Sequence, residues 1–296
     1  MNKIEKATLA LGNFDGVHTG HRRIIEKAID VGGKENVYVC SFEPHPLQVL
    51  VPNPPKIITP KEEKLRIIEE IIGVKYFAME FNMKLAKLTG EEFVQMLLDT
   101  FQIENVVVGA NYYFGDHARY SAKDLKELGK KYGFSVYIVH ELKEHGKVVS
   151  STRIRQYLSE GNVRHANKLL GREFSIQGIC QKGRGIGESI GFATANLATV
   201  DEYQYPAQGV YATKTILEDK EYISMTNVGY NPTVTEERTR MIETHLLDFN
   251  EVLYGKNIRV EFVQLMRPEE KYETLQELKD QLELDKQLVK KIFNKT

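Results

Sequence analysis

The chain has 296 residues, of which 42% are hydrophobic and 27% are charged, and this length is sufficient for two hydrophobic cores. Its 40 basic and 41 acidic residues give a formal net charge of -1, which excludes the overall positive field by which proteins hold nucleic acid. No run of 18 apolar residues could span a bilayer, and the first residues lack the apolar core of a signal peptide, so we expect a soluble cytoplasmic protein that does not contact a membrane.

The first half of the chain alternates β-rich runs with amphipathic helical stretches. The β-rich runs cover residues 8–11, 36–42, 74–81, 105–109 and 134–140, and the helical stretches between them cover residues 20–31, 60–72, 90–101 and 121–132. This alternation predicts βαβ units that build a parallel sheet with helices on both faces. Because ligands of such folds bind at the carboxyl ends of the strands, functional motifs are expected there.

The second half has a different pattern. Two short helices are expected at residues 152–159 and 163–170, and β-type runs then follow at residues 175–183, 209–217, 222–228, 241–249 and 257–266. Since no long helix separates these runs, they predict an antiparallel barrel or sandwich, closed by one helix over residues 269–294. Cys40 and Cys180 lie in different halves and indicate neither a disulfide framework nor a zinc cluster.

The first chemical motif lies where the first predicted strand meets the first helix. The letters GNFDG at residues 12–16 follow the strand, and HTGH at residues 18–21 opens the helix. His18 and His21 fall on one helix face, and Gly20 between them lets a ligand approach the backbone. The free amides and dipole of the helix N-terminus favour phosphate, so a nucleoside triphosphate is expected there, with the histidines donating hydrogen bonds to the departing pyrophosphate. The alternative is a pair of surface histidines on a capped helix.

A second motif, SSTRIR at residues 150–155, combines hydroxyl groups with two guanidinium groups at a helix start. Arg153 and Arg155 could bind phosphate oxygens in a bidentate manner. The alternative is a simple N-cap by Ser151 or Thr152, which explains the hydroxyls but less readily the two arginines.

Together these segments resemble the nucleotidylyltransferase module of prokaryotic riboflavin kinase/FAD synthetases. That family has GxFDGxHxGH, FxPHP and ISSTxIR segments, which correspond here to residues 12–21, 42–46 and 149–155. The second half is similar to the family's kinase module, with GFATANL at residues 191–197, NVGYNPT at residues 227–233 and ETH at residues 243–245. The resemblance implies an α/β, Rossmann-like FMN adenylyltransferase domain over residues 1–172 and a riboflavin kinase-like antiparallel β-barrel with a terminal helix over residues 173–296.

The resemblance also implies two reactions, phosphorylation of riboflavin to FMN and adenylylation of FMN to FAD, with ATP and Mg²⁺ and with no nucleic-acid partner. We expect a monomer or weak homo-oligomer. His18 and His21 would act in adenylyl transfer. The implied ATP and phosphate pocket comprises Gly12, Asn13, Phe14, Asp15, Gly20, Ser151, Thr152 and Arg155. The implied flavin-binding residues are Asn111, Tyr112, Tyr113 and Phe114, although these aromatic side chains could equally be core.

In the kinase half, Gly183, Gly185 and Gly187 would form a flap over the ATP phosphates. Thr194 and Asn196 would supply oxygen ligands for Mg²⁺, and Glu243 would be the base that accepts the proton of the ribityl hydroxyl. The alternatives are ordinary turn glycines and a solvent-facing glutamate.

Two departures from the family pattern leave other functions open. Ala193 replaces the family's proline, which removes a fixed φ from the loop, so the second domain could be a weak or silent kinase that acts as a flavin-binding module. Residues 116–121 lack the glycines that the family often has there.

Other functions remain possible for a module with an HxGH segment. These are nucleotidylyl transfer to nicotinamide mononucleotide, nucleotidylyl transfer to phosphopantetheine, and flavin sensing by a regulator without turnover.

Overall fold

The computed structural model describes residues 3–181, 192, 194–198, 200, 202–230 and 240–294. The chain divides into two compact units, Met1–Ser151 and Thr152–Thr296, which are described separately. The domain boundary expected after residue 172 stays a prediction. In this division helix α7 (Val163–Leu170) and all but the first residue of α6 (Ser151–Ser159) belong to the second unit.

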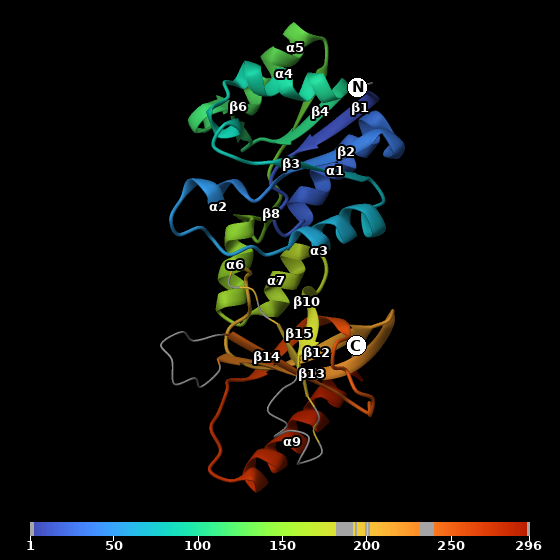
Figure 1. The fold of residues 1–296 in the computed structure, drawn as a ribbon, viewed down its shortest axis with the longest axis vertical. Coiled ribbons are helices and arrows are strands. Elements are labelled where there is room, and N and C mark those ends of the chain that lie inside the picture. The colour runs from blue at the N-terminus through green and yellow to red at the C-terminus, as the bar shows by residue number, and fades with distance from the viewer. Residues whose placement is uncertain are drawn as a thin grey trace. The chain divides into compact units, whose positions relative to one another are not determined.

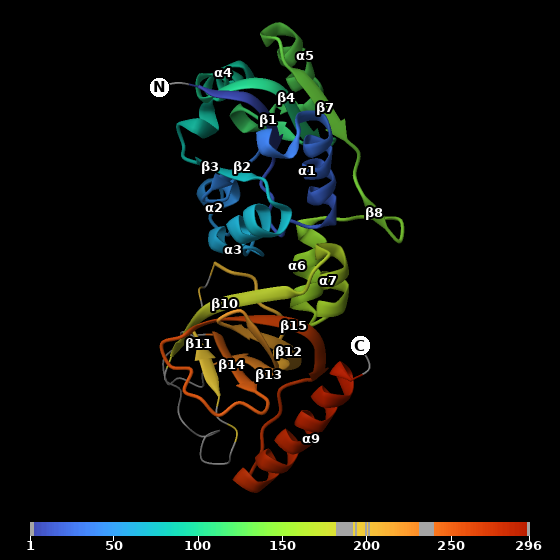
Figure 2. The ribbon, with the colours of Figure 1, turned by 90° about the vertical axis from the view of Figure 1, so that its right-hand side faces the viewer.

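The first unit is built on a five-stranded sheet in the order β3-β2-β1-β4-β7. The strands are β1 (Ile4–Leu11), β2 (Val37–Glu43), β3 (Lys75–Glu80), β4 (Phe101–Gly109) and β7 (Ser135–Val139), and all neighbouring pairs are parallel. Helices α4 (Gly90–Thr100) and α5 (Ala122–Tyr132) cover one face, and α1 (Thr19–Gly32) and α3 (Lys61–Leu65) lie on the other (Figures 1 and 2). The predicted parallel sheet with helices on both faces is confirmed.

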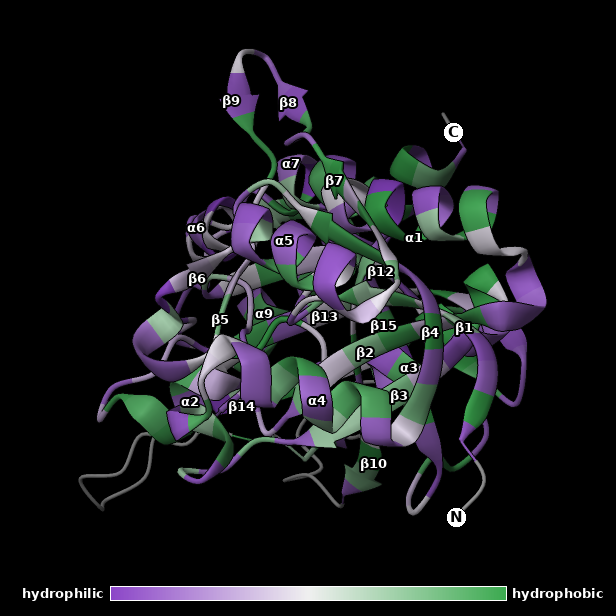
Figure 3. Cartoon of the chain, turned by 90° about the horizontal axis from the view of Figure 1, so that it is seen from above, coloured by the Kyte–Doolittle hydropathy of each residue, from purple (hydrophilic) through white to green (hydrophobic). Residues whose placement is uncertain are grey.

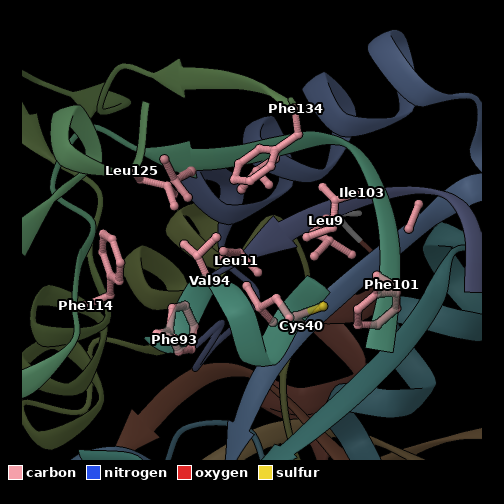
Figure 4. Packing of buried hydrophobic residues seen from close by; sticks show 14 of the residues in the cluster. Leu9, Leu11, Cys40, Phe93, Val94, Phe101, Ile103, Phe114, Leu125 and Phe134 are labelled. Carbon is pink, nitrogen blue, oxygen red and sulfur yellow. The ribbon is translucent and has the colours of Figure 1, made fainter. Parts of the chain in front are cut away.

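The sheet lies between two hydrophobic cores. The core on the α4 and α5 side includes Leu9, Leu11, Phe93 and Phe114 (Figure 4). The core on the α1 side includes Phe14, and both cores take residues from β1, β2 and β4. Helices α1 and α4 carry both hydrophobic and hydrophilic residues along their length (Figure 3). Their hydrophobic residues recur at helical spacing, so each helix presents one apolar stripe to the sheet. The N-terminal unit thus holds the loops at the carboxyl ends of its strands on a rigid support.

Several elements differ from the sequence-based expectations. The helix expected at residues 60–72 is α3 followed by a π-helical stretch, Arg66–Ile72, which ends at Gly73 with φ 79°. In this stretch the adjacent Ile67 and Ile68 are both fully buried. The terminal helix α9 (Leu275–Phe293) begins six residues later than expected, because the Thr274 side chain accepts a hydrogen bond from the amide of Glu277 and so caps the helix there.

Short elements escaped prediction because they contain too few residues to show periodicity. These are α2 (Pro46–Leu50), β5 (Tyr113–Phe114), β6 (Tyr120–Ser121), β8 (Lys143–Glu144), β9 (Lys147–Val148), β11 (Ala195–Leu197), and the 3₁₀ turns Lys34–Asn36, Leu85–Lys87 and Asp116–Ala118.

The second unit is a closed barrel in the strand order β10-β11-β14-β13-β12-β15. Besides β11, its strands are β10 (Phe174–Gln181), β12 (Gly209–Leu217), β13 (Lys220–Tyr230), β14 (Arg240–Leu246) and β15 (Asn257–Arg267). The paired strands are antiparallel. Because β10 pairs with both β11 and β15, the sheet closes on itself, and the structure is a barrel and not a sandwich. Helix α9 packs against it through Val289 and an ion pair of 2.8 Å between Asp285 and Arg267.

The barrel interior contains a cluster of five hydroxyl groups that the sequence did not reveal. Its members are Thr213, Thr215, Ser224, Thr226 and Thr244, and all have 0% exposure. Each hydroxyl is within 2.8–2.9 Å of another member. Because buried hydroxyls are tolerated only when hydrogen-bonded, this mutual pairing explains how a polar row fits into the core. Across the described part of the chain, no helix is both long enough and apolar enough to cross a membrane.

Candidate functional site

The turn between β1 and α1 has an unusual backbone. Phe14, Gly16 and Val17 have φ values of 48°, 92° and 38°. A β-branched residue such as Val17 rarely adopts a positive φ, so this turn is strained. Strain of this kind persists only where surrounding contacts hold it, and it concentrates at ligand-binding sites. The ring of Phe14 is fully buried and fills the space beside Gly12, where an added Cβ would lie 3.2 Å from the ring.

The two predicted histidines lie together at the start of α1. Their rings are stacked, with centroids 3.5 Å apart and planes inclined by 14°. His18 is the N-cap of α1, and its Nδ1 accepts a hydrogen bond of 3.2 Å from the backbone amide of His21. In a neutral ring this acceptor role places the proton on Nε2, which makes Nε2 a donor. A Cβ on Gly20 would lie 3.2 Å from the His18 ring, so this glycine makes room for the stacked pair.

The strained turn is held by its own Asp15 side chain and by two side chains, those of Ser151 and Ser41, from elsewhere in the same unit. The carboxylate of Asp15 is 2% exposed and accepts hydrogen bonds from the amides of Ile58 and Thr59, each 3.0 Å long. The hydroxyl of Ser151 donates to the carbonyl of Asp15 at 2.7 Å, and the hydroxyl of Ser41 donates to the carbonyl of Asn13 at 2.8 Å. The structure therefore brings Ser151 to the turn, but as a support of its backbone.

A buried ion pair lies beneath this turn, and sequence reasoning did not find it. Lys64, whose side chain is 4% exposed, donates to Oε1 of Glu43 at 2.8 Å and to the Ser41 hydroxyl at 3.3 Å. The hydroxyl of Tyr76 donates to the same Oε1 at 2.7 Å. Burial and the hydrogen bond to Glu43 raise the pKa of Tyr76 above its ordinary value, so the phenol stays a neutral donor. The network links the sheet and α3 to Asn13 through Ser41.

The order of the strands places this turn where a ligand-binding site is expected in such a sheet. Strands β2 and β3 extend from one side of β1, whereas β4 and β7 extend from the other. The carboxyl end of β1 is thus the topological switch point of the sheet, where α/β folds bind their ligands. Helix α1 has no acidic residue in its first turn, so no carboxylate of that turn offsets the positive end of its dipole. These features together suit an anionic ligand such as a triphosphate.

The four predicted flavin-binding residues follow β4 at the same edge of the sheet, but their exposures differ. Phe114 is 5% exposed and belongs to the core, where its ring centroid lies 5.5 Å from that of Phe93. Tyr112 stacks on Phe114 at 5.8 Å and is half-buried, whereas Tyr113 is 61% exposed. Asn111 is exposed and its Oδ1 lies over Gly109. The residues with surface available to a ligand are therefore Asn111, Tyr112 and Tyr113.

The residues of the second motif after Ser151 lie on α6, beyond the division between the units. Thr152 is exposed, and Arg155 is half-buried. Arg153 donates to the hydroxyl of Tyr157 at 3.3 Å and its guanidinium carbon lies 5.7 Å from the centroid of that ring.

In the barrel, three polar residues lie side by side on neighbouring strands. Asn196 on β11 pairs with Glu243 on β14, and Glu243 pairs with Asn227 on β13. Directly paired residues point to the same face of a sheet with their Cβ atoms about 4.5–5.5 Å apart. Ile242 and Thr244, the neighbours of Glu243 in sequence, are completely buried, so the row of three lies on the outer face of the barrel.

Two residues predicted for the kinase site are therefore neighbours, and a further polar residue lies beside them. Asn196 and Glu243 are cross-strand neighbours as a joint role requires. Asn227 was quoted as part of a motif without a role, and only the strand register places it beside Glu243. Thr194 is exposed and precedes β11 by one residue. The glycines predicted for the flap, Gly183, Gly185 and Gly187, lie outside the described residues, as does Ala193.

The first unit is a parallel α/β sheet with a strained HxGH turn at its switch point. The second is an antiparallel barrel that carries a row of amide and carboxylate side chains. This combination defines a protein of the nucleotidylyltransferase type with an additional β-barrel module. Comparison with known proteins agrees with this class. The FAD synthetase family matches residues 1–153, and the riboflavin kinase family matches residues 170–293.

Similar proteins extend over nearly the whole chain. A bifunctional riboflavin kinase/FMN adenylyltransferase of Bacillus subtilis (strain 168) is 35% identical over 296 residues, which cover 98% of this chain and 93% of the relative. The protein of the same description from Escherichia coli (strain K12) is 35% identical over 298 residues and covers 99% and 94%. A crystal structure from Streptococcus pneumoniae, described as a macrolide-efflux protein, matches with a TM-score of 0.88 at 30% identity and covers 98% of this chain and 95% of that one. The chain belongs to the family of bifunctional riboflavin kinase/FMN adenylyltransferases.

Proposed function

We infer that this chain is a bifunctional enzyme that makes FAD in two ATP-dependent steps, phosphorylating riboflavin to FMN and then adenylylating FMN. The observation that carries this inference is that both family matches fall on units with a candidate site: the stacked histidines at the switch point of the sheet, and the Asn196–Glu243–Asn227 row of the barrel. Flavin and ATP are its substrates, as the family implies.

In adenylyl transfer, an oxygen of the FMN phosphate attacks the α-phosphorus of ATP, and the bond from that phosphorus to the bridging oxygen of pyrophosphate breaks. The attacking phosphate is already anionic at neutral pH, so alignment and charge stabilisation contribute most. We assign the donors for the leaving pyrophosphate to Nε2 of His18 and to the ring of His21. The tautomer of His18 supports this role, because its Nδ1 is engaged by the His21 amide.

In the kinase step, the terminal ribityl hydroxyl attacks the γ-phosphorus of ATP and ADP leaves. We assign the acceptor of the hydroxyl proton to Glu243. Mg²⁺ would be held by oxygen atoms of Thr194 and Asn196, and it would offset the negative charge of the ATP phosphates. The chemistry of these side chains fits that ion, because Mg²⁺ prefers hard oxygen ligands and takes few from the protein when it also binds phosphates.

For the first unit, we propose that Asn111, Tyr112 and Tyr113 receive the flavin, since an exposed phenol ring can stack on the isoalloxazine. The buried Phe114 would support Tyr112 from below. A cytoplasmic location and a monomeric or weakly oligomeric state remain predictions.

The two activities can be tested separately in one purified protein. With ATP and Mg²⁺, riboflavin and FMN are supplied in separate reactions and the flavin products are separated by chromatography. His21→Ala should lower FAD formation from FMN by about 10²–10³-fold, as loss of a preorganised donor does, and leave FMN formation from riboflavin intact. Glu243→Gln should do the reverse, with a loss of about 10²–10⁴-fold in FMN formation.

The results also separate the alternatives. A wild-type protein that makes FAD but no FMN would support the silent-kinase alternative suggested by Ala193. Absence of FAD from the FMN reaction would reject the adenylyltransferase assignment.

A further inference from the structure

Glu269 lies in the segment that joins β15 to α9 and contacts β13 of the barrel. Its carboxylate accepts a hydrogen bond from Nδ2 of Asn227 and another from Nε2 of Gln208, each 3.3 Å long. The same carboxylate lies directly over Gly229, where an added Cβ would be 2.6 Å from Oε1. The absence of a side chain at Gly229 therefore lets Glu269 approach Asn227.

This contact decides which way the amide of Asn227 faces. An ionised carboxylate only accepts hydrogen bonds, so the amide must turn its NH₂ group to Glu269 and its carbonyl oxygen away. That oxygen, Oδ1, is buried and has no hydrogen-bond partner within the described residues. A buried acceptor without a donor costs free energy, which indicates that a donor from a ligand completes it.

The register of the strands places this acceptor beside the proposed kinase base. Asn227 pairs directly with Glu243, the residue assigned to accept the proton of the ribityl hydroxyl. The phosphate groups of ATP carry only acceptor oxygens at neutral pH and would be repelled by another carbonyl. The ribityl chain of riboflavin carries hydroxyl groups, which are donors. An acceptor beside Glu243 therefore suits the flavin alcohol.

We propose that Asn227 is a binding residue for the ribityl hydroxyls in the kinase site, and that Glu269 is the positioning residue that holds its amide in the required orientation. This inference rests on the proposed kinase function for the identity of the site. It assigns roles to two residues that the motif comparison left without one.

Four variants test the proposal. Glu269→Gln can present either an oxygen or an NH₂ group to Asn227, so it removes the orientation. Asn227→Asp places a second carboxylate against Glu269. The double variant Asn227→Asp with Glu269→Gln restores a donor facing an acceptor and keeps an oxygen beside Glu243. Gly229→Ala displaces the Glu269 side chain from the opposite direction, and Gly229 lies in an extended strand with no left-handed φ.

The primary measurement is riboflavin affinity by quenching of flavin fluorescence with ADP and Mg²⁺ present, which requires no turnover. The KM values for riboflavin and ATP are measured alongside. Glu269→Gln and Gly229→Ala should weaken riboflavin binding about 3–10-fold, the value of one neutral hydrogen bond, and leave the KM for ATP unchanged. Asn227→Asp should weaken it more, and the double variant should recover to within about threefold of wild type. Glu273→Gln, an exposed glutamate of the same segment, is the matched control.

Each other outcome has a definite meaning. Riboflavin binding by Glu269→Gln equal to that of the control overturns the positioning role. A change in the KM for ATP or in the Mg²⁺ requirement, with riboflavin binding unchanged, overturns the assignment to the ribityl chain. A failure of the double variant to recover overturns the orientation argument. A wild-type protein that binds riboflavin but forms no FMN contradicts the kinase function. In that case the riboflavin affinities of the variants relative to wild type still decide whether Asn227 and Glu269 have the proposed roles.

Discussion

The ion pair between Lys64 and Glu43, beneath the turn between β1 and α1, offers a quantitative test of how the first unit is held together. Lys64→Met keeps an unbranched side chain of similar length but removes the charge that Glu43 faces at 2.8 Å. It also removes the donor to Ser41, whose hydroxyl supports the carbonyl of Asn13. We therefore expect both a loss of stability and a weaker nucleotide site.

The magnitude follows from the exposure of the two partners. Removing one member of a buried ion pair costs about 3–5 kcal/mol. Lys64 is 4% exposed, but Glu43 is 23% exposed and keeps its hydrogen bond from Tyr76, so we expect the lower end, about 3 kcal/mol. In a unit of this size each kcal/mol lowers Tm by about 2–4 °C, which predicts a fall of about 6–12 °C.

The assay is calorimetry combined with loss of FAD formation on heating, which reports the first unit. Lys61→Met, an exposed lysine of the same helix, is the control. The double variant Lys64→Met with Glu43→Gln should lose less unfolding free energy than the two single variants lose in sum. The difference should be at least about 1 kcal/mol, because the two groups interact directly. A fall in Tm of less than about 2 °C for Lys64→Met would show that the pair contributes little net stability. The KM for ATP in FAD formation should rise, and FMN formation should be unchanged.

Three further predictions concern other contacts. Gly32→Ala would place a methyl group 2.1 Å from Oγ1 of Thr8, so this overpacking should cost about 2–3 kcal/mol in urea denaturation, and an unchanged midpoint would contradict the packing. Asp285→Ala leaves Arg267 without the carboxylate that binds it at 2.8 Å, and it should destabilise the second unit by about 3 kcal/mol; retention of wild-type stability would show that α9 does not depend on this pair. Burial raises the pKa of Cys180 to about 11. Since only the thiolate reacts, about one thiol in a thousand is reactive at pH 8, and the rate with Ellman's reagent should rise about tenfold per pH unit towards pH 10; a rate at pH 8 near that of free cysteine would contradict this.

Much of the architecture could be predicted because the local periodicity of hydrophobic residues determines it. Alternating β-rich and amphipathic segments predicted the parallel sheet, and the strand runs after Gly171 predicted an antiparallel module. The motif at residues 12–21 placed two histidines at a helix start, and the structure has them stacked there. These features depend on residues close in sequence, for which spacing and turn chemistry are sufficient guides.

Features that depend on contacts between distant parts of the chain were harder to predict from the sequence. The π-helical stretch after α3 stands where an α-helix was expected, and an ideal 3.6-residue period does not predict this change of helix type. The choice between barrel and sandwich required the pairing of β10 with both β11 and β15, which closes the sheet.

The sequence by itself determined the kinds of groups at each site and their order along the chain. Only the tertiary structure decided that Ser41 and Lys64 support Asn13, and that Glu269 faces Asn227 beside Glu243. The physical reason is that a hydrogen bond between distant segments depends on strand register and packing, which place side chains to within a few tenths of an ångström, whereas local spacing along the chain carries no such information.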